Sequence, residues 1–181
     1  MLALQPQPEC ITLEQYELLP EDKRIEIFEG IIYDMASPSQ IHQALSMQLS
    51  TIINNYILQK KGACSIFNAP FDVKLSDKPL TIVQPDIMII CDRNKLDGKR
   101  CNGAPDFIVE IVSPSSRKTD YSTKNTLYSD AGVREYWIVD PTRESIDVYY
   151  FESETMERYC FKDKVKVGIY EDLEIDFSEI N

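Results

Sequence analysis

The chain has 181 residues, the length of one domain, and is long enough to bury a core without disulfide or metal support. Residues 1–181 are therefore expected to form a single domain. Hydrophobic residues make up 43% of the chain and charged residues 27%, proportions typical of a soluble globular protein. The net charge of −11 argues against non-specific binding of nucleic acid, although a metal-dependent site is itself acidic and a local basic patch can oppose the average charge.

The compartment is predicted from the absence of targeting features and from the cysteines. No apolar run approaches the roughly 20 residues that a membrane helix requires, and the first ten residues, MLALQPQPEC, lack the basic and apolar regions of a signal peptide. We expect no membrane association and a cytoplasmic location. The cysteines are odd in number, scattered and without a CxxC pair, so unpaired thiols are expected rather than a zinc site or disulfide framework.

The first third of the chain predicts two helices and a hairpin. A short helix is expected over residues 11–20, where Thr12 is a candidate N-cap. Next, RIEIFEGIIYDMA predicts a hairpin that turns at Glu29-Gly30. Apolar residues at helical spacing then predict the clearest helix, over residues 37–61.

The one histidine of the sequence, His42, lies in the first turn of this long helix. A helix N-terminus disfavours the charged imidazole, so a phosphate there would be bound by helix amides more than by imidazole charge. A surface or capping role is the simpler interpretation, and a role in a functional site is the alternative.

The middle of the chain predicts three strands and a basic loop. CSIFNAPFDVKLS predicts a strand interrupted by a proline, and TIVQPDIMIIC predicts a strand in which Pro85 indicates an end, an edge or a bulge. The loop CDRNKLDGKRC has four basic and two acidic side chains and is either a candidate phosphate contact or a solvated loop. DFIVEIVS is apolar on both faces, which predicts a central strand covered on both sides.

The last third predicts a helix that carries Lys124 on its inner stripe and ends at Gly132. EYWIVDP and SIDVYYFES predict two strands joined at Asp140-Pro141, and ERYCFK is a candidate for another strand. The acidic tail from residue 170 onward is expected to be peripheral. Together the elements predict an α/β fold in which a mixed sheet is flanked by helices.

Glu110 is the first candidate for a functional site, because it lies between Ile108 and Val112 on an apolar face of the central strand. A charge in that position is costly unless it is paired or bound to a metal. Asp106 has the same side-chain parity, but four residues of strand span roughly 13 Å, too far for both acids to bind one ion with ligands about 2.1 Å away. Asp106 is therefore predicted to be a strand-start or turn residue.

Asp86 is a better partner for Glu110, because a separation of 24 positions suffices for one strand, the basic loop and a return beside it. Adjacent strands lie about 4.8 Å apart, so two carboxylates on one face can share a divalent cation. Oxygen ligands suit Mg²⁺ or Mn²⁺. The alternatives are a Pro-Asp turn for Asp86 and a buried ion pair with an arginine for Glu110, and the residues alone favour neither reading.

Two further charged residues have both a structural and a functional interpretation. Lys124 either forms a surface pair with Asp120 or extends its stem toward solvent, or it lies beside a metal, positions the attacking water and stabilises charge on phosphate. Glu26, on the predicted hairpin, could pack over the same site, although a solvent-facing glutamate is the default.

Several motifs, in order along residues 12–150, resemble the Uma-two family of restriction-endonuclease-like proteins: RIEIFEGIIYDMASPSQIH, PDIMII, GAPDFIVEIVSPSS, and then D, K, Y, GV and EYWIVDP. This family belongs to the PD-(D/E)XK nuclease superfamily, whose fold is a mixed sheet flanked by helices. The resemblance implies Asp86 as the motif aspartate, Glu110 as the second metal carboxylate and Glu26 as an auxiliary acid. Val112 stands where the superfamily usually has lysine, and Lys124 of the following helix is implied to replace it.

The resemblance thus implies a restriction-endonuclease-like domain that hydrolyses DNA with Mg²⁺ or Mn²⁺. Asp86, Glu110 and the backbone carbonyl of Ile111 would hold the metal, and Lys124 and Glu26 would complete the catalytic set.

The alternative is a noncatalytic binding or assembly protein that retains the nuclease fold, which the acidic balance and the displaced lysine favour. A hydrolase of small phosphodiesters would share the same site. Edge strands and the aromatic residues Tyr149 and Tyr150, expected to be exposed, also suggest a homodimer.

Overall fold

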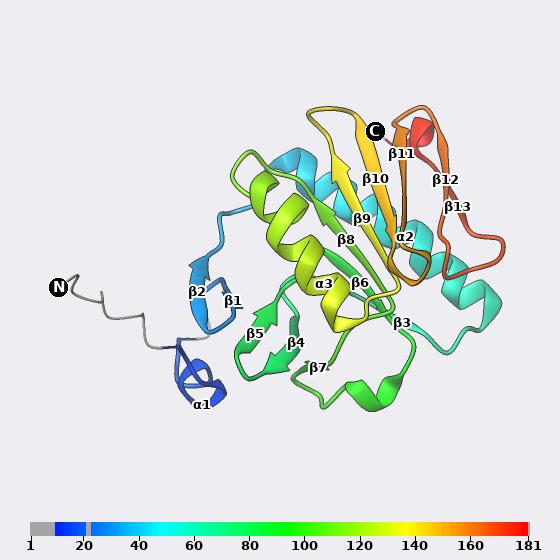
Figure 1. Cartoon of the computed structure of the whole chain (residues 1–181). Helices are drawn as coiled ribbons and strands as arrows, with labels where there is room; N and C mark the ends of the chain where they lie inside the picture. The colour runs from blue at the N-terminus through cyan, green and yellow to red at the C-terminus, as the bar shows by residue number, and fades with distance from the viewer. Residues whose placement is uncertain (1–9, 21–22, 181) are drawn as a thin grey trace.

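The computed structural model describes residues 10–20 and 23–180 (Figure 1). Within these ranges the strands form two larger sheets and a small one. The first sheet has the order β2-β1-β5-β4-β7, with bounds β1 Ile25–Phe28, β2 Ile31–Asp34, β4 Asp72–Asp77, β5 Leu80–Val83 and β7 Arg100–Asn102. The second has the order β11-β10-β9-β8-β6-β3, with bounds β3 Ser65–Asn68, β6 Ile87–Ile90, β8 Phe107–Ile111, β9 Glu135–Asp140, β10 Ser145–Tyr150 and β11 Thr155–Cys160. The small sheet pairs β12 (Lys164–Lys166) with β13 (Glu174–Asp176).

The helices connect and cover these sheets. They are α1 (Leu13–Tyr16), α2 (Gln40–Lys60), a π-helical segment (Thr119–Lys124) that continues into α3 (Asn125–Ala131), and 3-10 turns at Arg93–Lys95, Phe151–Ser153 and Phe177–Glu179. Both larger sheets are mixed, because β4 pairs with β7 and β8 pairs with β9 in parallel while their other pairs are antiparallel. The predicted mixed sheet with flanking helices is therefore confirmed.

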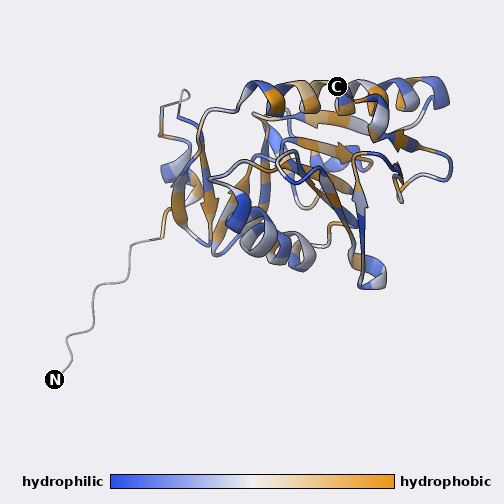
Figure 2. Ribbon diagram, turned by 90° about the horizontal axis from the view of Figure 1, so that it is seen from above, coloured by the Kyte–Doolittle hydropathy of each residue, from blue (hydrophilic) through white to orange (hydrophobic). Residues whose placement is uncertain are grey.

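The six-stranded sheet is covered on both faces, with α2 on one side and α3 on the other (Figure 2). Phe107 and Val109 of β8 pack in the same core as the buried stripe of α2. Ile108 and Val112 point to the opposite face, where they pack with Tyr128 of α3 and with residues of the five-stranded sheet. Every residue of β8 is buried, as its two apolar faces predicted.

The N-terminal elements form largely where the sequence predicts them. Thr12 makes the capping box that begins α1. Glu29 and Gly30 both have left-handed backbone conformations, with φ of 51° and 83°, as a tight two-residue hairpin turn requires. The long helix begins at Gln40, later than predicted, and its buried stripe starts at Leu45, because Ile41 in its first turn is 62% exposed.

The prediction of one strand across TIVQPDIMIIC is wrong, because Pro85 separates two strands that belong to different sheets. Pro85 has no N–H to donate to a strand ladder. The preceding amide, that of Gln84, donates to the side chain of Glu26 instead. The chain therefore passes from β5 to β6 at this point, which places Asp86 at the junction of the two sheets.

The acidic tail is not peripheral as predicted. Leu173, Ile175 and Phe177 are buried, and they pack on the α2 side of the six-stranded sheet with Trp137. Alternate residues of this segment are apolar, so its acidic side chains can face outward while it covers the core. Tyr149 and Tyr150 are likewise only partly exposed, since both pack against the hydrophobic core.

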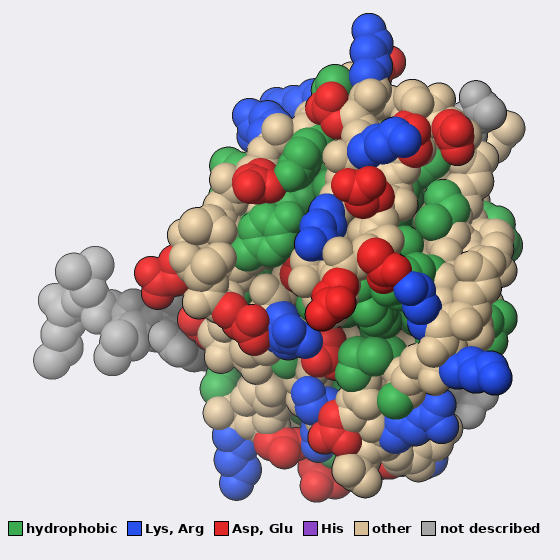
Figure 3. Space-filling model, turned by 90° about the vertical axis from the view of Figure 1, so that its right-hand side faces the viewer, with side chains coloured by type: hydrophobic (Ala, Val, Ile, Leu, Met, Phe, Trp, Pro, Cys, Tyr) green, Lys and Arg blue, Asp and Glu red, His purple; other side chains and the backbone are tan. Residues whose placement is uncertain are grey.

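Charges are mixed on the surface that Figure 3 shows. Lysine and arginine side chains there lie beside aspartate and glutamate side chains, with apolar side chains between them. This face therefore offers no continuous basic surface for a duplex.

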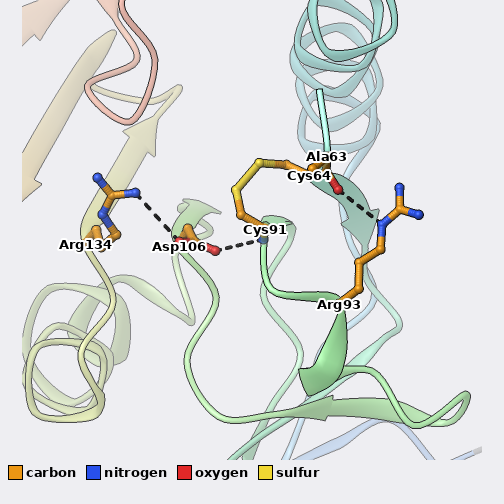
Figure 4. Close-up of a disulfide and its surroundings, with 6 residues drawn as sticks. All are labelled: Ala63, Cys64, Cys91, Arg93, Asp106 and Arg134. Atoms are coloured by element: carbon orange, nitrogen blue, oxygen red, sulfur yellow. Dashed lines mark hydrogen bonds and ion pairs between the residues drawn. A yellow bond between two sulfur atoms is a disulfide. The ribbon is translucent and has the colours of Figure 1, made fainter. Parts of the chain in front are cut away.

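Cys64 and Cys91 form a disulfide, which corrects the prediction of unpaired thiols for this pair (Figure 4). Ser65 pairs with Ile90 in the antiparallel ladder of β3 and β6, so the two cysteines lie opposite each other one position further along. Scattered spacing in the sequence could not indicate this register. The other cysteines, at positions 10, 101 and 160, are free thiols.

None of the described helices has the length and hydropathy of a membrane span. The single domain, the cytoplasmic location and the homodimer stay predictions.

Candidate active site

A cleft of about 590 Å³ lies between the β1–β2 hairpin, the N-terminus of α2, the start of β6, the end of β8 and the segment that leads into the π-helix. Glu26, Asp86, Glu110, Ile111 and Lys124 all line this cleft. The structure thus brings together, from four separate segments of the chain, the residues that the sequence predicted for the site.

Lys124 is buried at the centre of this group, with 4% of the residue exposed. Its Nζ lies 2.9 Å from Glu110 Oε1, 2.9 Å from Glu26 Oε1 and 3.9 Å from Asp120 Oδ1. Both Asp120 and Lys124 belong to the π-helical segment, a rare conformation that is frequent at functional sites. Lys124 therefore does pair with Asp120, but the pair is buried, so the alternatives of a surface pair and of a stem directed to solvent are wrong.

Glu110 and Asp86 occupy neighbouring strands, as the spacing predicted. Ile87 pairs with Val109, so the antiparallel register of β6 and β8 sets Asp86 opposite Glu110. Glu110 Oε1 accepts hydrogen bonds from Lys124 Nζ at 2.9 Å and from the hydroxyl of Tyr128 at 2.6 Å. The predicted alternative of an arginine partner for Glu110 is wrong.

Asp86 is fixed at the junction of the sheets by two contacts of one carboxylate oxygen. Asp86 Oδ2 accepts a hydrogen bond from the amide of Ile111 at 2.7 Å and lies 2.9 Å from His42 Nε2. These contacts leave the other oxygen, Oδ1, as the atom of this carboxylate that can serve a ligand.

Glu26 is buried, with 6% exposed, so the default of a solvent-facing glutamate is wrong. Its Oε1 accepts a hydrogen bond from the amide of Gln84 and also contacts Lys124. Glu26 belongs to the five-stranded sheet and Glu110 to the six-stranded sheet, so Lys124 joins carboxylates from both.

Negative charge exceeds positive charge around Lys124, and the pKa values respond accordingly. Burial, together with the carboxylates of Asp86, Asp120 and Glu26, raises the pKa of Glu110 well above its ordinary value, although Lys124 opposes the shift. Burial alone would lower the pKa of Lys124, but Glu110, Glu26 and Asp120 raise it well above its ordinary value. The surrounding carboxylates favour the bound proton on both Glu110 and Lys124, so both shifts have the same sign.

Asp120 is a member of the site that sequence reasoning missed. It is buried, with 1% exposed, and its Oδ1 has no hydrogen-bond partner. Burial raises its pKa to about 6, against the lowering effect of Lys124. Asp120 lies four residues before Lys124, so the two share one face of a helix, and this spacing is the feature of the sequence that could have indicated its place in the site.

His42 also lines the cleft, so the structure favours the alternative of a role in the site over the simpler interpretation as a surface or capping histidine. Its side chain is 13% exposed and contacts Asp86, while Nδ1 is buried without a hydrogen-bond partner. The contact joins residues 44 positions apart in the sequence, so periodicity within the helix could not indicate it.

Asp106 and the basic loop lie away from the cleft. Asp106 Oδ2 accepts a hydrogen bond from the amide of Cys91 (Figure 4), which confirms the predicted structural role. In the loop, Arg93 Nε donates to the carbonyl of Ala63, and no basic residue of the loop lines the cleft. The loop follows β6, whereas Asp86 precedes it, so the two occupy opposite ends of that strand. The structure therefore gives no support to a phosphate contact by this loop.

The described residues of the cleft offer oxygen ligands to a divalent cation, although these do not form a complete cage. In the part of the chain that the structure describes, no three side chains of His, Cys, Asp or Glu form a ready cage for a metal. The chemistry nevertheless fits a hard cation, because Asp86, Glu110 and Asp120 supply carboxylate oxygens in one cleft and Asp120 Oδ1 is buried without a partner. A bound cation would also offset the charge of the neighbouring carboxylates, which adds to burial in raising the pKa of Glu110.

The fold and the acidic, lysine-containing cleft define a restriction-endonuclease-like protein. The chain belongs to the Uma2 family, described as "Putative restriction endonuclease", whose model matches residues 13–175. It is 29% identical over 137 residues to the uncharacterized protein slr1290 of Synechocystis sp., a match that covers 75% of this chain and 70% of that protein. Its fold is similar to a crystal structure from Anabaena variabilis described as a "putative nuclease belonging to DUF820", with a TM-score of 0.78 and 22% identity, over 94% of this chain and 97% of the other.

Proposed function

We propose that this protein is a metal-dependent endonuclease that hydrolyses phosphodiester bonds of DNA. The observation that carries the proposal is the buried ammonium of Lys124, held 2.9 Å from both Glu26 and Glu110 in a cleft that Asp86 also lines. Membership of the Uma2 family and the nuclease fold support it.

Asp86, Glu110 and the backbone carbonyl of Ile111 would hold Mg²⁺ or Mn²⁺. When bound, such an ion supplies Lewis-acid stabilisation of the phosphate and lowers the pKa of water. The amide of Ile111 keeps the Asp86 carboxylate in place on the neighbouring strand.

Lys124 acts as a hydrogen-bond donor and a fixed positive charge. Its raised pKa keeps the amine protonated at neutral pH, so it cannot take a proton from water. The ammonium instead orients the attacking water and stabilises negative charge that develops on the phosphate. Glu26, itself held by the amide of Gln84, fixes the position of that ammonium.

Asp120 is the carboxylate suited to accept a proton from the attacking water. Its pKa of about 6 leaves it ionised, yet still basic, near neutral pH. Asp120 lines the cleft, and its Oδ1 is buried without a hydrogen-bond partner.

Cleavage of DNA by single-residue variants tests the proposal. Supercoiled plasmid and single-stranded oligonucleotides are incubated with Mn²⁺ and either wild-type protein, Asp86→Asn or Lys124→Met. We expect cleavage by the wild type and a loss of at least 100-fold in both variants. Asp130→Asn is the matched control, because it removes an exposed carboxylate from the same helical segment. Equal cleavage by wild type and Asp86→Asn, or none by either protein on any substrate, would contradict the proposal.

A noncatalytic binding protein that retains the fold is the rival function. It is favoured by the engagement of Glu110 Oε1, which already accepts hydrogen bonds from both Lys124 and Tyr128. Calorimetric titration with Mn²⁺ distinguishes the two functions. A nuclease binds the ion and loses that binding when Asp86→Asn and Glu110→Gln are combined, whereas a purely structural cluster binds none.

A further inference from the structure

One face of the β1–β2 hairpin forms a wall of the cleft. Arg24, Glu26 and Phe28 alternate along the chain and all line the cleft. Tyr33 of β2 is paired with Glu26 and lines the cleft as well. Directly opposite residues of antiparallel strands project to the same face, so this wall presents a cation, a carboxylate and two aromatic rings.

Tyr33 has an open ring on a rigid support. It is 46% exposed, although it lies beside the buried Glu26. Its ring packs against that of Phe28, which is 5% exposed, with 4.8 Å between the ring centroids. An aromatic ring that packs against a buried ring and is itself half-exposed in a cleft is suited to stack on a planar ligand.

Arg24 differs from the other arginines of the described residues, each of which has a carboxylate or carbonyl partner. Arg24 forms no ion pair with any described residue, and its Nε is buried without a hydrogen-bond partner. Guanidinium groups without a protein partner bind phosphate strongly. The N-cap of α2, Ser39, lies at the same cleft, where the positive end of the helix dipole also favours an anion.

The charge of the cleft favours an unpaired strand over a duplex. Among the described residues, Arg24 and Lys124 are the arginine and lysine side chains that line the cleft. Lys124 already forms ion pairs with Glu26 and Glu110. Duplex affinity depends on many phosphate contacts, which a protein of net charge −11 is poorly equipped to make. Stacking needs no positive surface and contributes roughly 5- to 140-fold in affinity per base.

We propose that this wall binds one unpaired nucleotide of a DNA strand, with Arg24 on its phosphate and the ring of Tyr33 on its base. The substrate class is then single-stranded DNA or an unpaired end, with continuous duplex as the poorer ligand. This inference rests on the proposed nuclease function and specifies its substrate.

Fluorescence anisotropy with the full chain tests the inference, using Ca²⁺ in place of Mg²⁺ to suppress cleavage. The probes are a labelled single-stranded DNA oligonucleotide and a hairpin duplex of the same length. We expect the single strand to bind at least tenfold more tightly. Tyr33→Ala should weaken its binding by about 5- to 140-fold, whereas Tyr33→Phe, which keeps the ring, should stay within about twofold of wild type.

Arg24→Ala should also weaken binding and reduce the slope of log affinity against log salt by about 0.7, the value for one phosphate of a single strand. Arg93→Ala removes the same charge beyond the far end of β6 and is the control, expected to match wild type. Thermal unfolding establishes that each variant is folded. If Arg24→Ala is not folded, Arg24→Lys takes its place, and the exposed Tyr33 variants test the base contact independently.

Three results would each overturn the inference. They are an affinity of Tyr33→Ala for the single strand equal to that of wild type, tighter binding of duplex than of single strand, and no DNA binding by the wild type. A dimer that Tyr33→Ala dissociates would assign the ring to an interface between copies and overturn it too. Failure of the nuclease function is seen separately: Tyr33-dependent binding without cleavage in Mn²⁺ refutes the endonuclease and leaves the inference standing.

Discussion

The ammonium of Lys124 lies 2.9 Å from Glu110 Oε1, and both side chains are 5% exposed. The pair is therefore a buried ion pair inside a cluster that contains more acids than bases. Removal of one partner from such a pair leaves an uncompensated charge, which costs far more than the intact pair contributes.

Lys124→Met is expected to lower the free energy of unfolding by about 3–5 kcal/mol, because Glu26 and Glu110 then repel each other in a buried site. Urea denaturation at pH 7 measures the change. Lys118→Met, at an exposed position just before the π-helical segment, should change stability by less than about 0.5 kcal/mol. A loss of less than about 1 kcal/mol in Lys124→Met would show that the cluster is not organised around this ammonium.

Asp120 should make stability fall as pH rises. Burial raises its pKa to about 6 from an ordinary value of 3.8, so the folded state binds the proton more tightly than the unfolded state. The resulting stabilisation is fully present below pH 3.8 and is lost as pH rises to about 6, and it amounts to about 3 kcal/mol. Unfolding free energies measured between pH 4 and pH 7 should therefore decline less steeply in Asp120→Asn than in wild type. Asp130→Asn should keep the wild-type slope, and parallel curves for all three proteins would refute the assignment.

Mn²⁺ should stabilise the protein at pH 8, where the excess carboxylate charge is greatest. An ion that binds the folded state alone stabilises it by about 2.7 kcal/mol at 100 times its dissociation constant. A rise in the thermal unfolding midpoint with Mn²⁺ concentration reports this binding without any measurement of cleavage. The rise should be smaller at pH 5, where protons compete for the same oxygens, and absent in Asp86→Asn. An equal rise in Asp86→Asn would place the ion elsewhere.

Loss of the Cys64–Cys91 disulfide should cost about 3.5 kcal/mol, because the bond closes a loop with a sequence separation of 27. The double variant Cys64→Ala/Cys91→Ala, compared with wild type in urea under oxidising conditions, gives the value. Cys10→Ala/Cys160→Ala alters two exposed free thiols and serves as the control. If a reductant destabilises the control but leaves the Cys64→Ala/Cys91→Ala protein unchanged, the stabilisation belongs to this bond.

The sequence predicts those parts of the site in which a charged residue interrupts an apolar pattern. Glu110 stood on an apolar face of a central strand, and Lys124 stood on an apolar helical stripe, so both positions required a partner. Pro85 likewise indicated a strand end, although its wider effect, a change of sheet, depends on contacts that no local pattern contains.

The features that the sequence does not predict depend largely on contacts between residues far apart in the chain. All four residues of β1 are buried, so its periodicity could not reveal that Glu26 faces a cleft. His42 reaches Asp86 across 44 positions, and Cys64 meets Cys91 only through the register of β3 and β6. The acidic residues of the tail predict a peripheral segment, whereas its alternate apolar residues determine its packing.

The two carboxylates that share the Lys124 ammonium belong to different sheets, so the orientation of the sheets and the charge of the cleft are coupled. A displacement of the β1–β2 hairpin would lengthen the contact with Glu26 and transfer more of the ammonium's attraction to Glu110. Conversely, an anion that draws Lys124 toward itself would release the hairpin from its electrostatic attachment to the six-stranded sheet. Ligand binding would then weaken the attachment between the two sheets, and Lys124 would be the side chain that couples the two events.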